Sequence, residues 1–249
     1  MPAPANETRV AIRPGSSYSD DMKFPRRTAR TNAAFVLAGL LACGIAFAAD
    51  APDPDPSRFS GEIDAFALWD SKNAVPEHAI LFVGSSSIRY WPTALAFPGK
   101  PIVNRGFGGS ELSDVIHYYD RVIAPYAPAK IFLYAGDNDI ANGKGARQVF
   151  EDYKELATRV RADFPDTELV FLSIKPSDAR WKKWPTMAEA NKLIREYTAT
   201  DPKLRYVDVA SILLGDDGLP KDVYILDGLH LNEDGYRLWQ QVIAPLLVD

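Results

Sequence analysis

The sequence predicts a three-layer α/β/α sandwich built around a central, mostly parallel sheet of five strands. Apolar, strand-like runs alternate along the chain with segments of helical spacing, an order that pairs strands in parallel. These runs are almost continuously apolar, as expected when helices cover both faces of a sheet. With 47% hydrophobic and 11% aromatic residues, the 249-residue chain has enough apolar side chains for a large packed core.

Nine segments make up this pattern. The five predicted strands are Ala79 to Val83, Pro101 to Asn104, Ile131 to Ala135, Glu168 to Ile174 and Arg205 to Val209. The four predicted helices are Glu111 to Ile123, Ala146 to Asp163, Met187 to Thr198 and Glu233 to Leu246. We therefore expect one three-layer α/β domain over residues 59–249, with no internal repeat.

Residues 1–48 have the layout of a secretory leader. Four basic residues precede an uncharged stretch, residues 31–49, that ends in small side chains. Counted from Met1, the basic region before this stretch is too long for a signal peptide, but counted from Met22 its length is ordinary. We therefore expect translation to start at Met22 and cleavage to follow the Ala-x-Ala site at 46–48. The alternative is an uncleaved membrane anchor, but the run barely reaches the roughly 20 apolar residues that a span requires. We expect a secreted or periplasmic protein.

Cys43 is the only cysteine, and it lies in the leader. The mature chain would therefore have no disulfide, no thiol nucleophile and no thiolate metal ligand. The sequence "LLAC" loosely resembles a lipobox, so a lipoprotein modified at Cys43 is an alternative, although the second Leu is a poor match. In either case the protein would contact a membrane only through its leader.

Charge and composition exclude several classes of partner. The formal net charge is −5, and removal of the basic leader makes it −8. An acidic chain without a basic run is a poor nucleic-acid or anionic-membrane binder. The segment Asp50 to Ser57 alternates Pro with Asp, which predicts an extended, solvated linker over residues 49–58. The sequence does not indicate an oligomeric state.

Polar and glycine-rich motifs follow the predicted strands. The carboxyl ends of parallel strands meet at one edge of the sheet, where ligands bind. The motifs are "GSSS" at 84–87, "RGFGGS" at 105–110 and "GDND" at 136–139, and "DGLH" at 227–230 precedes the last helix. We expect these four motifs to form one site.

A serine hydroxyl becomes an effective nucleophile when a histidine removes its proton and a carboxylate orients that histidine. Of the three histidines, only His230 follows an aspartate, Asp227, in a glycine-containing loop. An oxyanion also needs hydrogen-bond donors, which Ser86, Gly109 and Asn138 can supply from three strand ends. The "GDND" motif fails as a calcium loop because Ala141 stands at its fifth position.

Four blocks of the sequence resemble the SGNH hydrolases, also called GDSL-type esterases and lipases: "FVGSSSI", "NRGFGGS", "YAGDND" and "DGLH". The resemblance implies a flavodoxin-like sheet and a nucleophile at Ser86, with Asp227 and His230 completing a triad. It also implies an oxyanion hole of Ser86, Gly109 and Asn138, and neither metal nor cofactor. The substrate would be a small-molecule, lipid or acetylated-glycan ester.

The family usually has Asp where this chain has Ser85, which leaves open how the turn before Ser86 is supported. That change is the only sequence support for a rival hypothesis, a non-catalytic envelope or glycan-binding module on the same fold. An α/β-hydrolase elbow is disfavoured because Ile88 stands where that motif needs Gly. Ser85 and Ser87 are expected to cap the following helix.

Four residues near the strand ends are candidates for a substrate cleft. Aromatic faces, which the two tryptophans would supply, suit acyl chains and sugar rings. The alternative is that these side chains only pack their loops onto the domain. The candidates are Arg89, Arg105, Trp181 and Trp184.

Overall fold

The structure is a computed structural model that describes residues 50–247. The predicted leader, with its start at Met22 and Cys43, lies outside the described residues. Within residues 50–247, no helix combines the length and the apolar character needed to cross a membrane.

The core is a sheet of five parallel strands in the order β2-β1-β3-β4-β5. The strands are β1 (Ile80–Gly84), β2 (Ile102–Gly106), β3 (Lys130–Tyr134), β4 (Glu168–Leu172) and β5 (Leu204–Val207). This order is that of flavodoxin-like folds, whose ligands bind at the carboxyl ends of β1 and β3, where the strand order reverses. The predicted fold class is confirmed, and each predicted strand end lies within two residues of the observed one.

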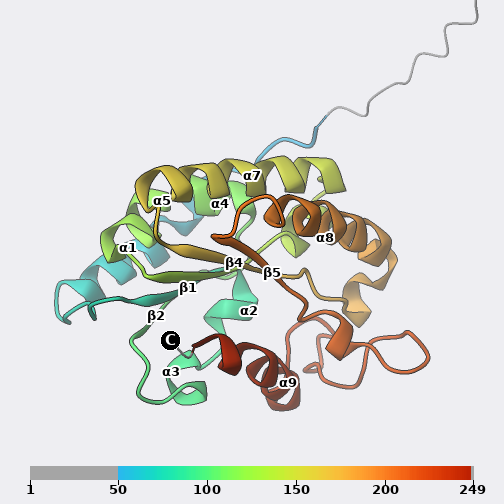
Figure 1. Cartoon of the computed structure of the whole chain (residues 1–249). Helices are drawn as coiled ribbons and strands as arrows, with labels where there is room; N and C mark the ends of the chain where they lie inside the picture. The colour runs from blue at the N-terminus through green and yellow to red at the C-terminus, as the bar shows by residue number, and fades with distance from the viewer. Residues whose placement is uncertain (1–49, 248–249) are drawn as a thin grey trace, which may run out of the picture. The chain divides into compact units, whose positions relative to one another are not determined.

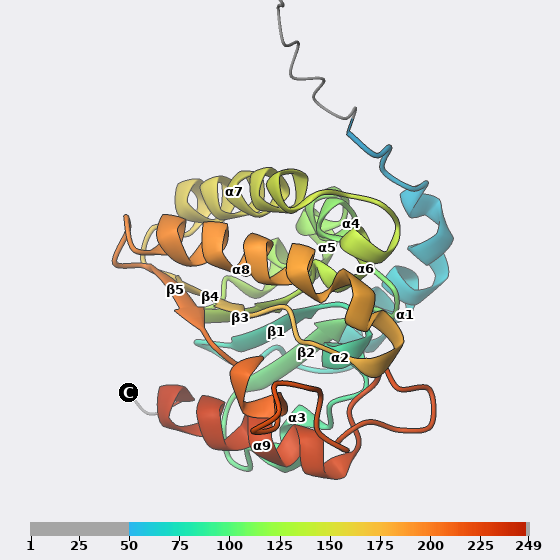
Figure 2. The same cartoon turned by 90° about the vertical axis from the view of Figure 1, so that its right-hand side faces the viewer.

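Helices cover both faces of the sheet (Figures 1 and 2). One face carries α1 (Ser60–Asp70), α4 (Leu112–His117), α5 (Tyr119–Val122), α7 (Ala146–Asp163) and α8 (Trp184–Thr198). The opposite face carries α3 (Thr93–Ala96) and α9 (Glu233–Ile243). Two short helices, α2 (Ser86–Arg89) and α6 (Asp137–Ala141), begin directly after β1 and β3.

Two apolar cores explain why β1 is apolar throughout. Alternate side chains of a strand point to opposite faces, and in β1 Leu81 and Val83 join one core while Ile80 and Phe82 join the other. In the second core the ring of Phe82 stacks on that of Phe132 at 4.8 Å between centroids. Each of these four β1 side chains is therefore buried, whichever face of the sheet it points to.

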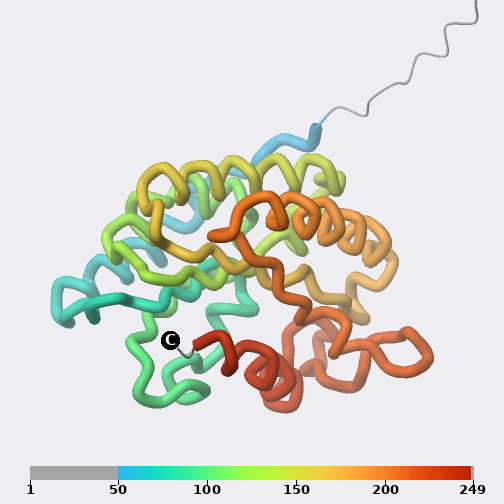
Figure 3. The backbone as a smooth tube through the Cα atoms, in the orientation of Figure 1, coloured from blue at the N-terminus to red at the C-terminus, as the bar shows by residue number. Residues whose placement is uncertain are grey.

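The C-terminal segment completes the second layer. The end of α9 runs beside the segment that contains α3 (Figure 3), and the Gln240 side-chain amide donates a hydrogen bond of 2.6 Å to the Ala96 carbonyl. Near the other end of the same helix, the Tyr236 hydroxyl donates to the Ser87 carbonyl at 3.0 Å. Through this hydrogen bond, α9 fixes the position of α2.

Some predicted helices differ from the observed ones. The single helix expected over 111–123 is broken at Tyr118 into α4 and α5, where the Tyr118 hydroxyl donates to the Pro56 carbonyl at 2.9 Å. Helix α1 was not predicted because it buries little more than Ile63 and so lacks a strong apolar repeat. Helices α3 and α6, of four and five residues, are too short for such a repeat to appear.

The prediction that residues 49–58 form a solvated linker is wrong in part. The backbone of Ala51 exchanges two hydrogen bonds with the Gln148 side chain of α7, at 3.0 and 2.7 Å. Asp53 forms an ion pair of 2.6 Å with Lys144, and residues Pro56–Phe59 form a 3-10 turn. The buried Lys144 ammonium requires carboxylates around it, a demand that the local Pro/Asp composition does not reveal.

Candidate active site

The turn after β1 depends on Gly84. Its φ is +129°, and a Cβ at this position would lie 1.9 Å from the carbonyl oxygen of Tyr134 in β3. The next residue, Ser85, donates its N–H to that same carbonyl at 2.9 Å. The backbone then enters α2, so that Ser86, half-buried, is the first residue of the helix.

The loop before α9 brings a histidine and a carboxylate to Ser86. The Oγ atom of Ser86 lies 2.9 Å from Nε2 of His230, and Nδ1 of His230 lies 2.5 Å from Oδ2 of Asp227. Asn232 caps the start of α9 by accepting the Gly235 N–H at 3.0 Å. An Nδ1–H tautomer of His230 directs an unprotonated Nε2 at the Ser86 hydroxyl, which is the arrangement that removes a hydroxyl proton.

Hydrogen bonds keep Asp227 ionised. Partial burial disfavours the charged form, but the His230 ring and the N–H groups of His230 and Leu229 all donate to this carboxylate, and the net effect lowers the pKa of Asp227 to about 2. The carboxylate is therefore negative throughout the neutral range. It can hold the histidine tautomer and stabilise an imidazolium.

The second and third strand ends supply candidate hydrogen-bond donors. The turn after β2 is tied to β1 by a bond from the Phe107 N–H to the Gly84 carbonyl at 2.8 Å, and Gly109 follows with a φ of +84°. Asn138 of α6 donates from Nδ2 to the Ser110 carbonyl at 3.0 Å. Among residues 50–247, no acceptor takes the N–H of Ser86 or of Gly109, so both are available to a ligand.

Ser85 and Ser87 differ from their expected capping roles. Ser85 occupies the N-cap position of α2, but its side chain makes no capping bond, and its buried Oγ has no hydrogen-bond partner within the described part of the chain. Ser87 lies inside the helix and is buried. The turn is instead supported by the backbone bonds that Ser85 makes, including its carbonyl accepting the Ile88 N–H at 2.9 Å.

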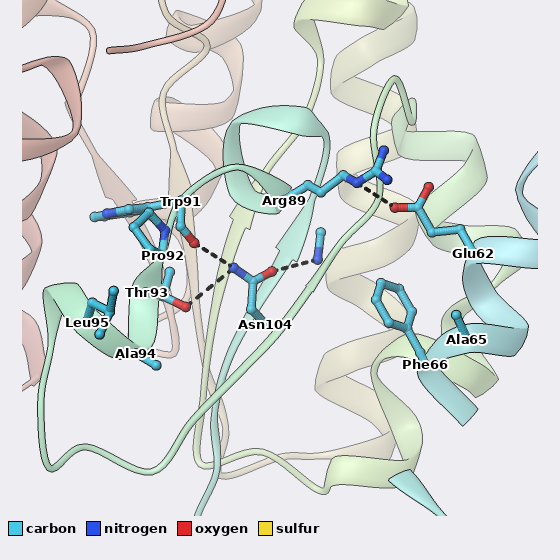
Figure 4. Close-up of a pocket in the computed structure, with 11 residues that line it drawn as sticks. Glu62, Ala65, Phe66, Arg89, Trp91, Pro92, Thr93, Ala94, Leu95 and Asn104 are labelled. Carbon is cyan, nitrogen blue, oxygen red and sulfur yellow. Dashed lines mark hydrogen bonds and ion pairs between the residues drawn. The ribbon is translucent and has the colours of Figure 1, made fainter. Parts of the chain in front are cut away.

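Arg89 borders a hollow of about 540 Å³ (Figure 4). Its Nε forms an ion pair of 3.0 Å with Glu62, and the hollow is bordered by Phe66 on one side and the α3 segment on the other. A side chain on Gly108 would contact the Arg89 guanidinium. Arg89 therefore lies between this hollow and the turn that carries Gly109.

Arg105 does not line a substrate cleft. Its side chain is 6% exposed, pairs with Asp70, and donates to the Tyr126 hydroxyl and the Asn104 carbonyl. Three aromatic rings, those of Phe66, Trp69 and Tyr126, flank the guanidinium at about 5 Å. These contacts hold α1 against the sheet and leave the guanidinium buried.

The two tryptophans pack against each other. The rings of Trp181 and Trp184 stack with 6.4 Å between centroids and an interplanar angle of 12°. Trp184 packs on the core beneath α8 and borders a separate hollow that also contains Tyr206 and Asp208. For Trp184 the packing alternative therefore describes the structure.

The same loop carries a residue that the sequence reasoning missed. Arg180 donates from a terminal nitrogen to Oδ1 of Asn138 at 2.8 Å and pairs with Asp137 at 3.0 Å. Arg180 lies eight residues beyond the end of β4, in the same segment as the two tryptophans, and that placement was the only signal in the sequence. Tyr90 was also missed; its ring meets the His230 ring edge-on at 5.0 Å.

Residues 78–238 match the model of the GDSL-like Lipase/Acylhydrolase family. This chain belongs to that family. The matched span contains Ser86, Gly109, Asn138, Asp227 and His230. Among residues 50–247, no cluster of three or more His, Cys, Asp or Glu side chains is arranged to hold a metal ion.

Solved structures share the family fold. A candidate platelet activating factor from Streptococcus pneumonia aligns with a TM-score of 0.69 and 27% identity, covering 77% of this chain and 94% of its own. A GDSL-like lipase from Bacteroides thetaiotaomicron aligns with a TM-score of 0.61 and 19% identity, covering 78% of this chain and 97% of its own. An acetylxylan esterase from Geobacillus stearothermophilus aligns with a TM-score of 0.56 and 11% identity, covering 69% of this chain and 94% of its own. No curated protein sequence shows significant similarity to this chain.

Proposed function

We propose that this protein is an exported serine esterase that hydrolyses carboxylic esters, acyl or acetyl, through an acyl-enzyme. The observation that carries the proposal is the contact of 2.9 Å between Ser86 Oγ and His230 Nε2, with Asp227 on the other ring nitrogen. The family supports ester hydrolysis, and the acetylxylan esterase among its structural neighbours supports acetylated carbohydrates as one substrate class.

The reaction would proceed in two halves. His230 accepts the Ser86 proton as Oγ attacks the ester carbonyl carbon, and the tetrahedral intermediate collapses when protonated His230 gives that proton to the leaving alcohol. Water then repeats the sequence on the acyl-Ser86 ester and releases the carboxylic acid. Asp227 stays ionised in both halves and stabilises the imidazolium, as its low pKa requires.

Three donors would stabilise the oxyanion: the N–H groups of Ser86 and Gly109 and the second hydrogen of Asn138 Nδ2. The first hydrogen of that amide is already used by the Ser110 carbonyl. Each such donor contributes roughly a hundredfold to a thousandfold in rate. No metal or cofactor takes part in this mechanism.

The proposal is tested with the purified protein and a panel of esters. We expect turnover of p-nitrophenyl acetate, and rates on longer p-nitrophenyl esters and on acetylated xylo-oligosaccharides then define the acyl length and the alcohol. Folded protein that hydrolyses none of these esters would refute the proposal and favour a binding module. Export is tested separately, by fractionation of the native host: we expect the protein outside the cytoplasm, and protein confined to the cytoplasm would refute export. Mass spectrometry of its N-terminus then shows whether the leader is cleaved or retained.

Asp227→Asn tests the charge on the third triad residue. The amide keeps the size of the side chain but removes the negative charge and the preferred histidine tautomer, so we expect kcat to fall about 10³- to 10⁴-fold with little change in KM. Because the pKa of Asp227 is about 2, wild-type activity between pH 4 and pH 8 should contain no step from this group. A variant with more than a tenth of wild-type kcat would contradict the role.

A further inference from the structure

The amide of Asn138 can serve an oxyanion only in one of its two orientations. Rotation by 180° would exchange the Nδ2 donors for the Oδ1 acceptor, whose lone pairs would repel a negative oxygen. Two neighbours select the orientation. The Ser110 carbonyl can only accept, and it faces Nδ2; the Arg180 guanidinium can only donate, and it faces Oδ1 at 2.8 Å.

Arg180 is itself held by a buried charge. A second terminal nitrogen of its guanidinium pairs with Asp137 Oδ2 at 3.0 Å, and the Asp137 side chain is only 5% exposed. Asp137 and Asn138 are the first two residues of α6. One planar guanidinium therefore contacts consecutive side chains, which a single ammonium could not do with the same geometry.

Asp137 also connects this group to the histidine loop. The buried Lys175 ammonium lies 4.0 Å from Asp137 Oδ2 and donates to the Leu229 carbonyl at 2.7 Å. Leu229 lies between Asp227 and His230. Burial lowers the pKa of Lys175 to about 8 against the opposing effect of Asp137. Two cations thus share one carboxylate beside the position where negative charge would develop.

We propose that Arg180 is a positioning residue of the oxyanion hole, acting through Asn138. It locks the amide with Nδ2 available to the substrate oxygen, and through Asp137 and Lys175 it keeps this amide in register with the loop of His230. This inference rests on the proposed esterase function. Its contribution is made in the transition state, so it should alter kcat rather than KM.

A double-mutant cycle tests the inference with four proteins: wild type, Arg180→Met, Asn138→Ala and the double variant. For Asn138→Ala we expect a loss of kcat of about 10²- to 10³-fold. For Arg180→Met we expect a smaller loss, about 10- to 100-fold, with KM changed less than about threefold. In the Asn138→Ala background, Arg180→Met should cost less than about twofold, because the group through which Arg180 acts is gone.

Matched variants separate positioning from folding. Arg161→Met removes an arginine of similar exposure, 25% against 18%, that pairs with Asp201 at 3.0 Å beside the start of β5; its kcat should equal that of wild type. Arg180→Lys keeps the positive charge, and its kcat should lie between those of wild type and Arg180→Met. Melting temperatures establish that each protein is folded at the assay temperature; if Arg180→Met is not, the cycle is run with Arg180→Lys.

Two outcomes would overturn the inference. One is a wild-type kcat in Arg180→Met. The other is a loss of kcat in the double variant equal to the product of the two single losses, which would mean that Arg180 acts independently of Asn138. Failure of the esterase function itself is distinguished by Ser86→Ala: if that variant retains wild-type hydrolysis, the proposed function fails before Arg180 is considered.

Discussion

Ser86→Ala is expected to lower kcat for p-nitrophenyl acetate about 10⁴-fold or more, because no other group can form the acyl-enzyme. The Ser86 hydroxyl is the one that His230 contacts, at 2.9 Å, and its loss leaves the oxyanion donors without an attacking atom. The missing hydroxyl removes one side-chain contact from a half-buried position, so we expect the melting temperature to change by only a few degrees.

Ser71→Ala is the matched control for this experiment. Its hydroxyl is exposed and donates to the Leu68 carbonyl at the end of α1, so its removal should leave kcat unchanged. Substantial hydrolysis by folded Ser86→Ala protein would mean that another residue is the nucleophile, and both the triad and the oxyanion assignment would then fail.

Lys144→Met is expected to reduce the free energy of unfolding by about 3–5 kcal/mol, because it leaves buried carboxylates without their cation. The Lys144 side chain is 1% exposed and lies 2.7 to 3.5 Å from Asp152, Glu111 and Asp139, in addition to its contact with Asp53. Both Glu111 and Asp139 are fully buried. Methionine fills the same volume without the charge.

Urea unfolding of Lys144→Met at pH 5 and pH 8 checks the electrostatic cause. Even with Lys144 present, burial raises the pKa of Asp139 to about 7. A carboxyl that holds its proton more tightly when folded destabilises the fold as pH rises from about 4 through that pKa. At pH 5 Asp139 is protonated and needs no cation, whereas at pH 8 it is ionised and depends on Lys144. The loss of stability caused by Lys144→Met should therefore be larger at pH 8 than at pH 5. Lys154→Met, at a half-exposed position, should change little; an equally stable Lys144→Met protein would contradict the account.

The strands and the long helices could be predicted because their signals are local. Apolar runs of parallel strands are continuous when both faces are covered, and α7 has a clear repeat at three and four residues. The break at Tyr118 and the docking of residues 51–53 depend on partners far along the chain, Pro56 in one case and Gln148 and Lys144 in the other. Local composition does not carry that information.

The candidate site shows the same division. Ser86, Gly109, Asn138, Asp227 and His230 could be selected because each follows or precedes an element whose end was predictable. The cleft residues could not, because position at a strand end does not determine direction. Arg105 is still within β2 and its side chain turns toward Asp70 of α1, whereas Arg180, eight residues beyond β4, turns toward Asn138.

Reaction with a fluorophosphonate probe tests the central claim most directly, since only an activated serine forms the covalent adduct. Intact-mass and peptide mass spectrometry of the wild-type protein should show one adduct, carried by Ser86. Ser86→Ala should remain unlabelled, and His230→Ala should label far more slowly because the base that activates the hydroxyl is missing. An unlabelled wild-type protein, or an adduct on a different serine, would contradict the assignment of Ser86 as the nucleophile.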